Sequence, residues 1–181
     1  MRRVVTGYSK EGKAIVALDS HAPRVTLLPN YPGYAMHEMW STVKDTHLPF
    51  RGGDPTLEIS HFIPAPGETR FSIMELPTLA ELQRLAESGS IDIAKAFAEF
   101  AEAMPDMGKA MEPDNSGMHT TDSIDYVVVL SGEIWCEVDD GVEVHLGPGE
   151  SLVQCGTRHA WSNKGSEPCV IAAVMVGANR R

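Results

Sequence analysis

A strict alternation of apolar and polar residues on both sides of one tight turn most constrains how this chain folds. Such alternation is what a strand with one buried face requires. The turn, Asp139-Asp140-Gly141, suits a hairpin because Asp and Gly tolerate a positive φ. The residues that we expect to face inward on its two strands are Ile134, Cys136, Val138, Val142, Val144 and Leu146.

Further short strands and turns surround this hairpin. Residues 126–130 form a β-branched run that suits a strand buried on both faces. The polar, Gly- and Pro-rich residues 41–55 predict a surface loop over the mouth of a barrel. The other predicted strands are residues 4–8, 14–18, 24–28, 34–40, 57–62, 70–76 and 151–154. Short antiparallel strands joined by tight turns predict an all-β fold, closed or sandwiched.

The hydrophobic period becomes helical in residues 77–105. Thr78 and Glu81 form a capping box for a first helix. The apolar side of a second helix is Ile93, Phe97, Phe100, Ala101 and Met104. We predict two short accessory helices near residues 78–104, packed outside the barrel or against a partner subunit. Residues 106–116 are predicted to form a linker that lines the entrance to the site.

Composition and charge limit the classes of partner and the cellular location that we expect for this chain. The chain has 181 residues, enough for one domain with its own core. Its net charge of −10 argues against nucleic acid or an anionic membrane surface as a partner. No apolar run approaches the length of a membrane span or the core of a signal peptide. The three cysteines have no CxxC spacing, which predicts a cytoplasmic protein without disulfides.

The best candidates for a metal site lie in one segment. His119, Thr121 and Asp125 share strand parity and so point to one side of a sheet. His159 follows a hairpin and is placed to converge on them. Two imidazoles and one carboxylate are a ligand set that holds a divalent metal and leaves positions open. Asp122 is an alternative carboxylate of opposite parity. The competing interpretation is a pair of hydrogen-bonded interior histidines without a metal.

The same segment resembles the two signature motifs of the cupin superfamily. The first motif is G-x5-H-x-H-x3,4-E-x6-G. In this chain His119 stands at its first His, Thr121 at its second His and Asp125 at its Glu, and Gly132 is its last residue. The second motif, G-x5-P-x-G-x2-H-x3-N, matches at Gly156, His159 and Asn163, with Gln154 in place of Pro.

The resemblance implies an antiparallel double-stranded β-helix, or jelly-roll barrel. One cupin domain would then span residues 1–181. Its parts would be N-terminal strands at 1–76, a helical insert at 77–105 and a core motif region at 117–176. Small cupins are commonly homodimers, and the N-terminal strands offer a sheet edge with which a partner can pair.

The resemblance also implies one divalent metal, iron, zinc, manganese or nickel, held by His119, Asp125 and His159. A metal with open positions predicts an enzyme that acts on a small oxygenated organic acid of aromatic or polyketide-like structure. A lyase or decarboxylase is expected ahead of an Fe(II) dioxygenase, and a ligand-binding cupin without metal or activity is the rival. The residues that we expect in the pocket are Thr121, Tyr126, Gln154 and Trp161. Arg158 is a candidate for binding the substrate carboxylate, although strand parity turns it away from His159.

Overall fold

Antiparallel β-sheets make up most of the fold in a computed structural model that describes residues 1–50, 53–114 and 117–181. The strands are β1 (Arg2–Tyr8), β2 (Ala14–His21), β3 (Arg24–Leu27), β4 (Ala35–Thr42), β5 (Thr69–Leu76), β6 (Ser123–Ser131), β7 (Ile134–Glu137), β8 (Glu143–Leu146), β9 (Ser151–Gln154), β10 (Ala160–Ser162) and β11 (Cys169–Gly177). They pair in three sheets within the described residues, and every pairing is antiparallel. The predicted all-β antiparallel barrel class is confirmed.

The largest sheet has the strand order β3-β4-β5-β11-β6-β9, and a smaller sheet has the order β10-β7-β8. The last strand, β11, lies in the middle of the large sheet between β5 and β6. Alternate residues of β6 and β11 face the core, because side chains of a strand point to opposite faces. Val129 and Ile171 pack there with Ile134 and Leu146 of the smaller sheet, so the core lies between the two sheets.

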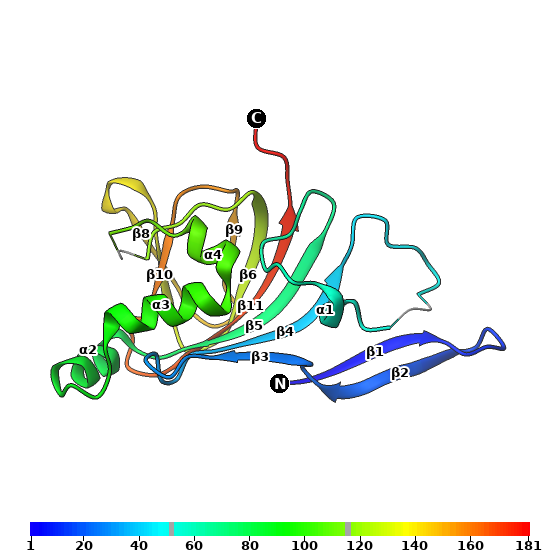
Figure 1. Ribbon diagram of the computed structural model, residues 1–181, viewed down its shortest axis with the longest axis horizontal. Coiled ribbons are helices and arrows are strands. Elements are labelled where there is room, and N and C mark those ends of the chain that lie inside the picture. The colour runs from blue at the N-terminus through cyan, green and yellow to red at the C-terminus, as the bar shows by residue number, and fades with distance from the viewer. Residues whose placement is uncertain (51–52, 115–116) are drawn as a thin grey trace.

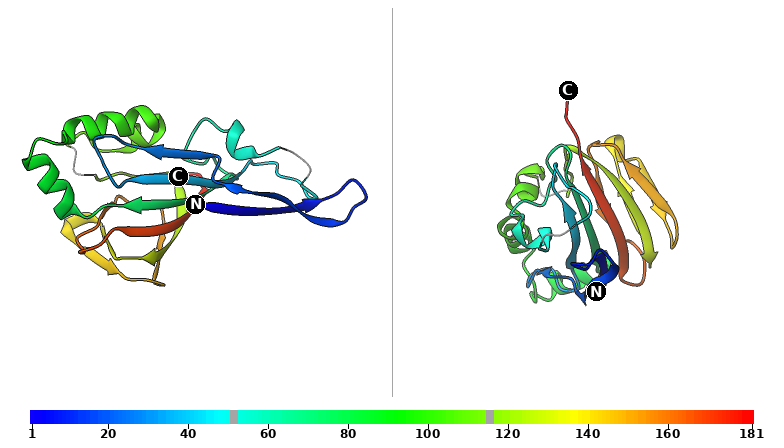
Figure 2. Two further views of the ribbon diagram at one scale, coloured as in Figure 1. Left: turned by 90° about the horizontal axis from the view of Figure 1, so that it is seen from below. Right: turned by 90° about the vertical axis from the view of Figure 1, so that its right-hand side faces the viewer.

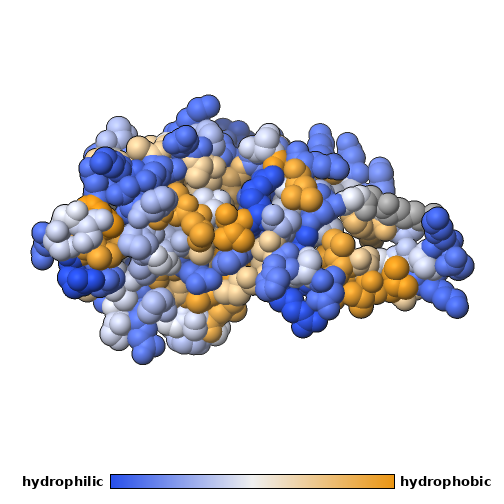
Figure 3. Space-filling view, turned by 60° about the horizontal axis from the view of Figure 1, so that its bottom comes forward, coloured by the Kyte–Doolittle hydropathy of each residue, from blue (hydrophilic) through white to orange (hydrophobic). Residues whose placement is uncertain are grey.

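Strands β1 and β2 form a hairpin that projects from the body of the molecule (Figure 1). Arg3 anchors its base, because it donates a hydrogen bond of 2.9 Å to the carbonyl oxygen of Met39 and forms an ion pair with Asp54. Hydrophobic side chains gather along this hairpin next to a hydrophilic tip (Figure 3). The exposed apolar residues of the hairpin are Val4, Tyr8, Ile15, Val16 and Leu18.

The helices are α1 (Pro55–Glu58), α2 (Leu79–Glu87), α3 (Ile93–Ala103) and α4 (Pro105–Ala110). Helices α2, α3 and α4 gather on one side of the body, and the smaller sheet lies on the opposite side (Figure 2). The predicted capping box is half present, since the Thr78 hydroxyl accepts a hydrogen bond from the Glu81 amide. Both helices predicted there are present as α2 and α3, and a further helix, α4, occupies residues 106–110 of the predicted linker. Residues 115–116 of that linker lie outside the described residues.

Local capping overrides the predicted strand at residues 57–62. The Asp54 side chain accepts a hydrogen bond from the Thr56 amide, and Pro55 starts α1, as proline favours the first helical turn. Residues 59–62 form no strand. The predicted inward positions Val142 and Val144 are also wrong, because both side chains are exposed.

The predicted loop at residues 41–55 does not cover the cavity described below. None of its described residues lines that cavity, and residues 51–52 lie outside the described residues. The loop leaves the end of β4 near the projecting hairpin, whereas α2, α3 and α4 lie at the other end of the molecule (Figure 1).

Candidate functional site

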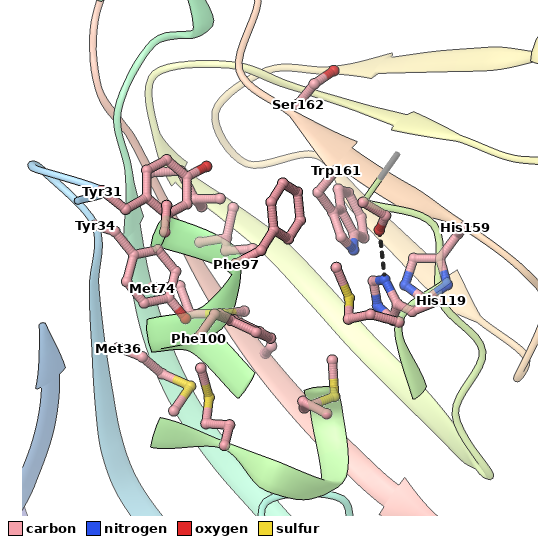
Figure 4. A pocket seen from close by; sticks show the side chains of 18 of the residues that line it. Tyr31, Tyr34, Met36, Met74, Phe97, Phe100, His119, His159, Trp161 and Ser162 are labelled. Carbon is pink, nitrogen blue, oxygen red and sulfur yellow. Dashed lines mark hydrogen bonds between the residues drawn. The ribbon is translucent and has the colours of Figure 1, made fainter. Parts of the chain in front are cut away.

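Two histidines from distant parts of the chain face each other. The amide of His119 donates to the carbonyl of His159 at 2.9 Å, and the reverse hydrogen bond is 3.0 Å long. This isolated antiparallel bridge brings the two imidazole rings to a centroid distance of 4.2 Å. The rings lie side by side next to Trp161 (Figure 4). The convergence expected from the sequence is present for this pair.

Backbone carbonyls fix the orientation of both imidazoles. Nδ1 of His119 lies 3.0 Å from the Gly117 carbonyl oxygen, and Nδ1 of His159 lies 2.9 Å from the Thr157 carbonyl oxygen. A carbonyl oxygen can only accept a hydrogen bond, so each Nδ1 carries the proton. In each neutral ring Nε2 is then the nitrogen with a free lone pair.

Burial keeps both rings neutral. The enclosed position of His119 lowers its pKa, because burial disfavours the charged imidazolium. Burial, together with repulsion from His119, lowers the pKa of His159 to about 4. At neutral pH the pair therefore presents two acceptors and no positive charge.

Asp125 adds a carboxyl group to the same cavity. It lies on the inward face of β6, and only 7% of it is exposed. Its Oδ1 is buried and has no hydrogen-bond partner among the described residues. Burial raises the pKa of this carboxyl, which therefore holds a proton at a higher pH than a solvated one does. Thr121, beside it, accepts a hydrogen bond of 2.9 Å from the Ser123 hydroxyl.

These polar groups lie in a cavity of about 660 Å³ whose walls are otherwise mostly apolar. The walls come from β4, β5, β6, β11 and the helices α2, α3 and α4, and aromatic and methionine side chains lie across the cavity from the imidazoles (Figure 4). The apolar wall includes Tyr31, Tyr34, Met36, Phe62, Met74, Phe97, Phe100, Met104, Met107, Met111, Trp161 and Met175. The site is thus a deep apolar cavity with a polar region.

The three predicted metal ligands do not form a closed set in this structure. No group of three or more His, Cys, Asp or Glu side chains in the described part of the chain is placed to hold a metal ion. Thr121 stands where a second imidazole of the motif would be, and Asp125 is one methylene shorter than Glu. The structure brings the two imidazoles together, and among the described residues it shows no group of three in which a carboxylate joins them.

The other predicted site residues separate into two groups. Thr121 and Trp161 line the cavity as expected. Tyr126 does not, because Asp125 points inward and its neighbour must point outward, where Tyr126 is 52% exposed. Gln154 is buried away from the cavity and accepts a hydrogen bond of 2.7 Å from the Thr157 hydroxyl. The alternative carboxylate, Asp122, is exposed and forms an ion pair with Arg180.

The helical insert supplies the part of the site that sequence reasoning missed. It was expected to pack outside the barrel or against a partner, yet its apolar face lines the cavity. Four of the five residues of the apolar side predicted for the second helix, all except Ala101, are in that wall. The helical period identified the apolar side, but no local pattern indicates which surface that side covers.

No helix in the described ranges is both long and apolar enough to cross a membrane.

Comparison with known proteins finds a family model that matches the segment carrying the histidines. Residues 110–176 match the family model for the cupin domain. Phomopsin biosynthesis cluster proteins C' and D of Diaporthe leptostromiformis are each 51% identical to this chain over 47 residues, which are 26% of this chain and 25% of each relative. The match thus spans about a quarter of the length of these curated relatives.

The similar solved structures are more distant in sequence. The cupin domain of Schizosaccharomyces pombe Cnp3 is 10% identical with a TM-score of 0.45, and the alignment covers 97% of this chain and 87% of that one. A cupin superfamily protein from Desulfitobacterium hafniense is 12% identical with a TM-score of 0.36, covering 60% and 67%. Residues 110–176, which carry both histidines and Asp125, are thus the part of this chain that is similar to the cupin domain.

Proposed function

We propose that this chain is a lyase that acts on a mostly apolar, oxygen-bearing organic molecule of aromatic or polyketide-like structure. The observation that carries the proposal is the cavity of about 660 Å³, which combines apolar walls with two imidazoles and a buried carboxyl group. A cavity of this size with a few convergent polar groups is typical of small-molecule sites. We propose the cytoplasm as the location of the protein. We propose no nucleic acid and no membrane as a partner.

The three polar side chains suit an acid–base elimination. His119 is the candidate base, since its Nε2 lone pair can take a proton from a substrate carbon. His159 is the weaker base, because its pKa is about 4, and it orients the substrate by accepting a hydrogen bond. The electron pair of the broken carbon–hydrogen bond forms a double bond as the neighbouring carbon–oxygen bond breaks. The Asp125 carboxyl gives its proton to the leaving oxygen, which departs as water.

A substrate screen with three variants tests this function. The protein is incubated with hydroxylated aromatic and polyketide-like acids and ketones, and loss of water or carbon dioxide is followed by mass spectrometry. We expect turnover that falls by roughly 100-fold or more in His119→Ala and in Asp125→Asn, while the surface variant His145→Ala retains it. Binding without turnover across the screen would favour the alternative, a ligand-binding cupin without activity.

A metal-dependent enzyme is the second candidate function. Two Nε2 lone pairs, each fixed by a backbone hydrogen bond at Nδ1, resemble the way proteins orient metal-binding imidazoles, and Asp125 Oδ1 has no partner among the described residues. His119 and His159 would hold iron, zinc, manganese or nickel, with Asp125 as the predicted third ligand. A bound metal would supply Lewis-acid chemistry, or oxygen chemistry if it were iron, which would indicate a dioxygenase.

Elemental analysis by inductively coupled plasma mass spectrometry distinguishes the two candidates. The purified protein is compared with His159→Ala and with the surface variant His145→Ala. Near-stoichiometric metal that is lost only in His159→Ala would favour the metal-dependent candidate. Equal, substoichiometric metal in all three proteins, even after reloading under reducing conditions, would favour the acid–base lyase.

A further inference from the structure

The two imidazoles in the polar region of the cavity offer hydrogen-bond acceptors and no donors. Nε2 of His119 and Nε2 of His159 can only accept in the neutral rings, because both Nδ1 atoms donate to carbonyl oxygens. The Asp125 carboxyl and the Ser72 hydroxyl also line the cavity, and each has a buried oxygen without a partner among the described residues. A buried polar group that stays unpaired is costly. The ligand group that satisfies the two Nε2 atoms must bring a hydrogen-bond donor.

The charges around the cavity do not favour an anionic ligand. Among the described residues that line it, Lys164 is the only Lys or Arg, and it already forms an ion pair with Glu143. Glu137 and Glu143 also line the cavity. Arg158, the sequence-based candidate for a substrate carboxylate, forms ion pairs with Glu112 at 2.6 Å and Asp139 at 3.0 Å. A carboxylate buried near the imidazoles would therefore lack a cationic partner, which is unfavourable.

The apolar walls indicate the rest of the ligand. Tyr31 and Tyr34 stack at a centroid distance of 5.3 Å, and Phe100 meets Tyr34 edge to face. Six methionines share the lining with them, Met36, Met74, Met104, Met107, Met111 and Met175. Thioethers and aromatic rings pack well against flat, polarizable molecules.

From these observations we infer that the ligand group seated against His119 and His159 is an uncharged hydroxyl carried on a flat apolar ring system, and not a carboxylate. This inference rests on the proposed function and narrows its substrate from an organic acid to a phenol-like or enol-like molecule. It places elimination of water ahead of decarboxylation among the lyase reactions.

Three naphthalene derivatives that differ in one substituent test the inference. The affinities of 2-naphthol, 2-naphthoate and 2-methoxynaphthalene are measured by isothermal titration calorimetry with the protein as purified. We expect 2-naphthol to bind about tenfold more tightly than either of the others, because only its hydroxyl can donate to Nε2. In His119→Ala the preference for 2-naphthol over 2-methoxynaphthalene should disappear, whereas Met74→Leu, a change in the apolar wall, should keep it.

The ratio of two affinities within one protein serves as the readout, so a general loss of folded variant does not imitate the effect. His159→Ala gives a second, independent test of the same ratio. If 2-naphthoate binds as tightly as 2-naphthol, or if the ether binds equally well, the inference is wrong while the proposed cavity function stands. If none of the three compounds binds, the proposed function fails as well.

Discussion

His159 links the polar region of the cavity to the stability of the fold. Its folded pKa, about 4, lies below the ordinary value of 6.5. Below pH 6.5 the imidazole of His159 binds a proton in the unfolded chain but not in the folded protein. Stability is therefore lost as the pH falls from 6.5 toward 4. His119 acts in the same direction, whereas the raised pKa of Asp125 acts in the opposite one.

We expect the free energy of unfolding to fall by about 2 kcal/mol between about pH 7 and about pH 5 on account of His159. Urea denaturation at the two pH values measures it. In His159→Gln the loss should shrink by about that amount, and the same change at exposed His47 should leave it as in the parent protein. An equal pH dependence in all three proteins would contradict the assignment.

Thr121 occupies the position at which a third imidazole could join the site. Its side chain is buried and lines the cavity, at the motif position of the second His. We expect Thr121→His to raise zinc or cobalt binding toward about one ion per chain, since three imidazoles form a good site for either metal. Thr120→His is the matched control, because Thr120 is exposed and of opposite parity. Calorimetric titration that shows no gain in Thr121→His relative to Thr120→His would refute this.

Strand parity accounts for what could be predicted of the site. Parity and motif spacing predicted that the two histidines converge, and the structure shows that pair. The prediction that placed Tyr126 in the pocket was wrong, because this residue follows the inward Asp125 and points outward. What sequence could not provide is the separation between side chains on different strands. That separation depends on the packing of whole sheets, and no group of three ligand side chains is found among the described residues.

The close contact between α3 and α4 fixes the position of these two helices in the wall of the cavity. A Cβ added at Gly108 would lie 2.6 Å from Cβ of Ala101 and 2.7 Å from its Cα, so the two helices can approach this closely only with glycine there. We expect Gly108→Ala to push α4 away from α3 and to cost about 1–3 kcal/mol of stability.

Thermal unfolding and 2-naphthol titration of Gly108→Ala measure this cost and its effect on the cavity. Affinity should fall together with stability, because Met107 of α4 lines the cavity. Gly147→Ala is the control, since its added Cβ would meet nothing closer than Glu150 Oε2 at 3.7 Å. Unchanged stability in Gly108→Ala would mean that the helices are not packed this tightly.

The elements that sequence misplaced share a cause. Alternation over residues 57–62 indicated a strand, but the Asp54 cap and Pro55 start helix α1 instead. Residues 106–110, predicted to belong to a linker, form α4 instead, because Pro105 opens a helix directly after α3 ends. A short run of alternating residues predicts a strand less reliably than a capping residue predicts the start of a helix. A proline that ends one helix is equally suited to the first turn of the next.

For the whole molecule we propose the homodimer expected from the sequence, with the projecting hairpin as part of its interface. A two-stranded hairpin is marginally stable alone in water, and β1 and β2 expose apolar residues such as Val16, 60% of which is accessible. We expect Val16→Asp to shift the protein from dimer to monomer in light scattering coupled to size-exclusion chromatography. Lys10→Asp at the hydrophilic tip should leave the mass unchanged, and a monomeric parent protein would contradict the proposal.

The central place of β11 has a consequence for how the protein is made. Strands β5 and β6 both pair with β11, so the halves β3-β4-β5 and β6-β9 of the large sheet join only through residues 169–177. A ribosome that has synthesised the first 168 residues has made both halves and the helices without the strand that unites them. The apolar faces of the two halves stay exposed until β11 has been made, and such intermediates are prone to aggregate. Slow translation just before residue 169 would lengthen that wait, whereas rapid completion of β11 would protect the nascent chain.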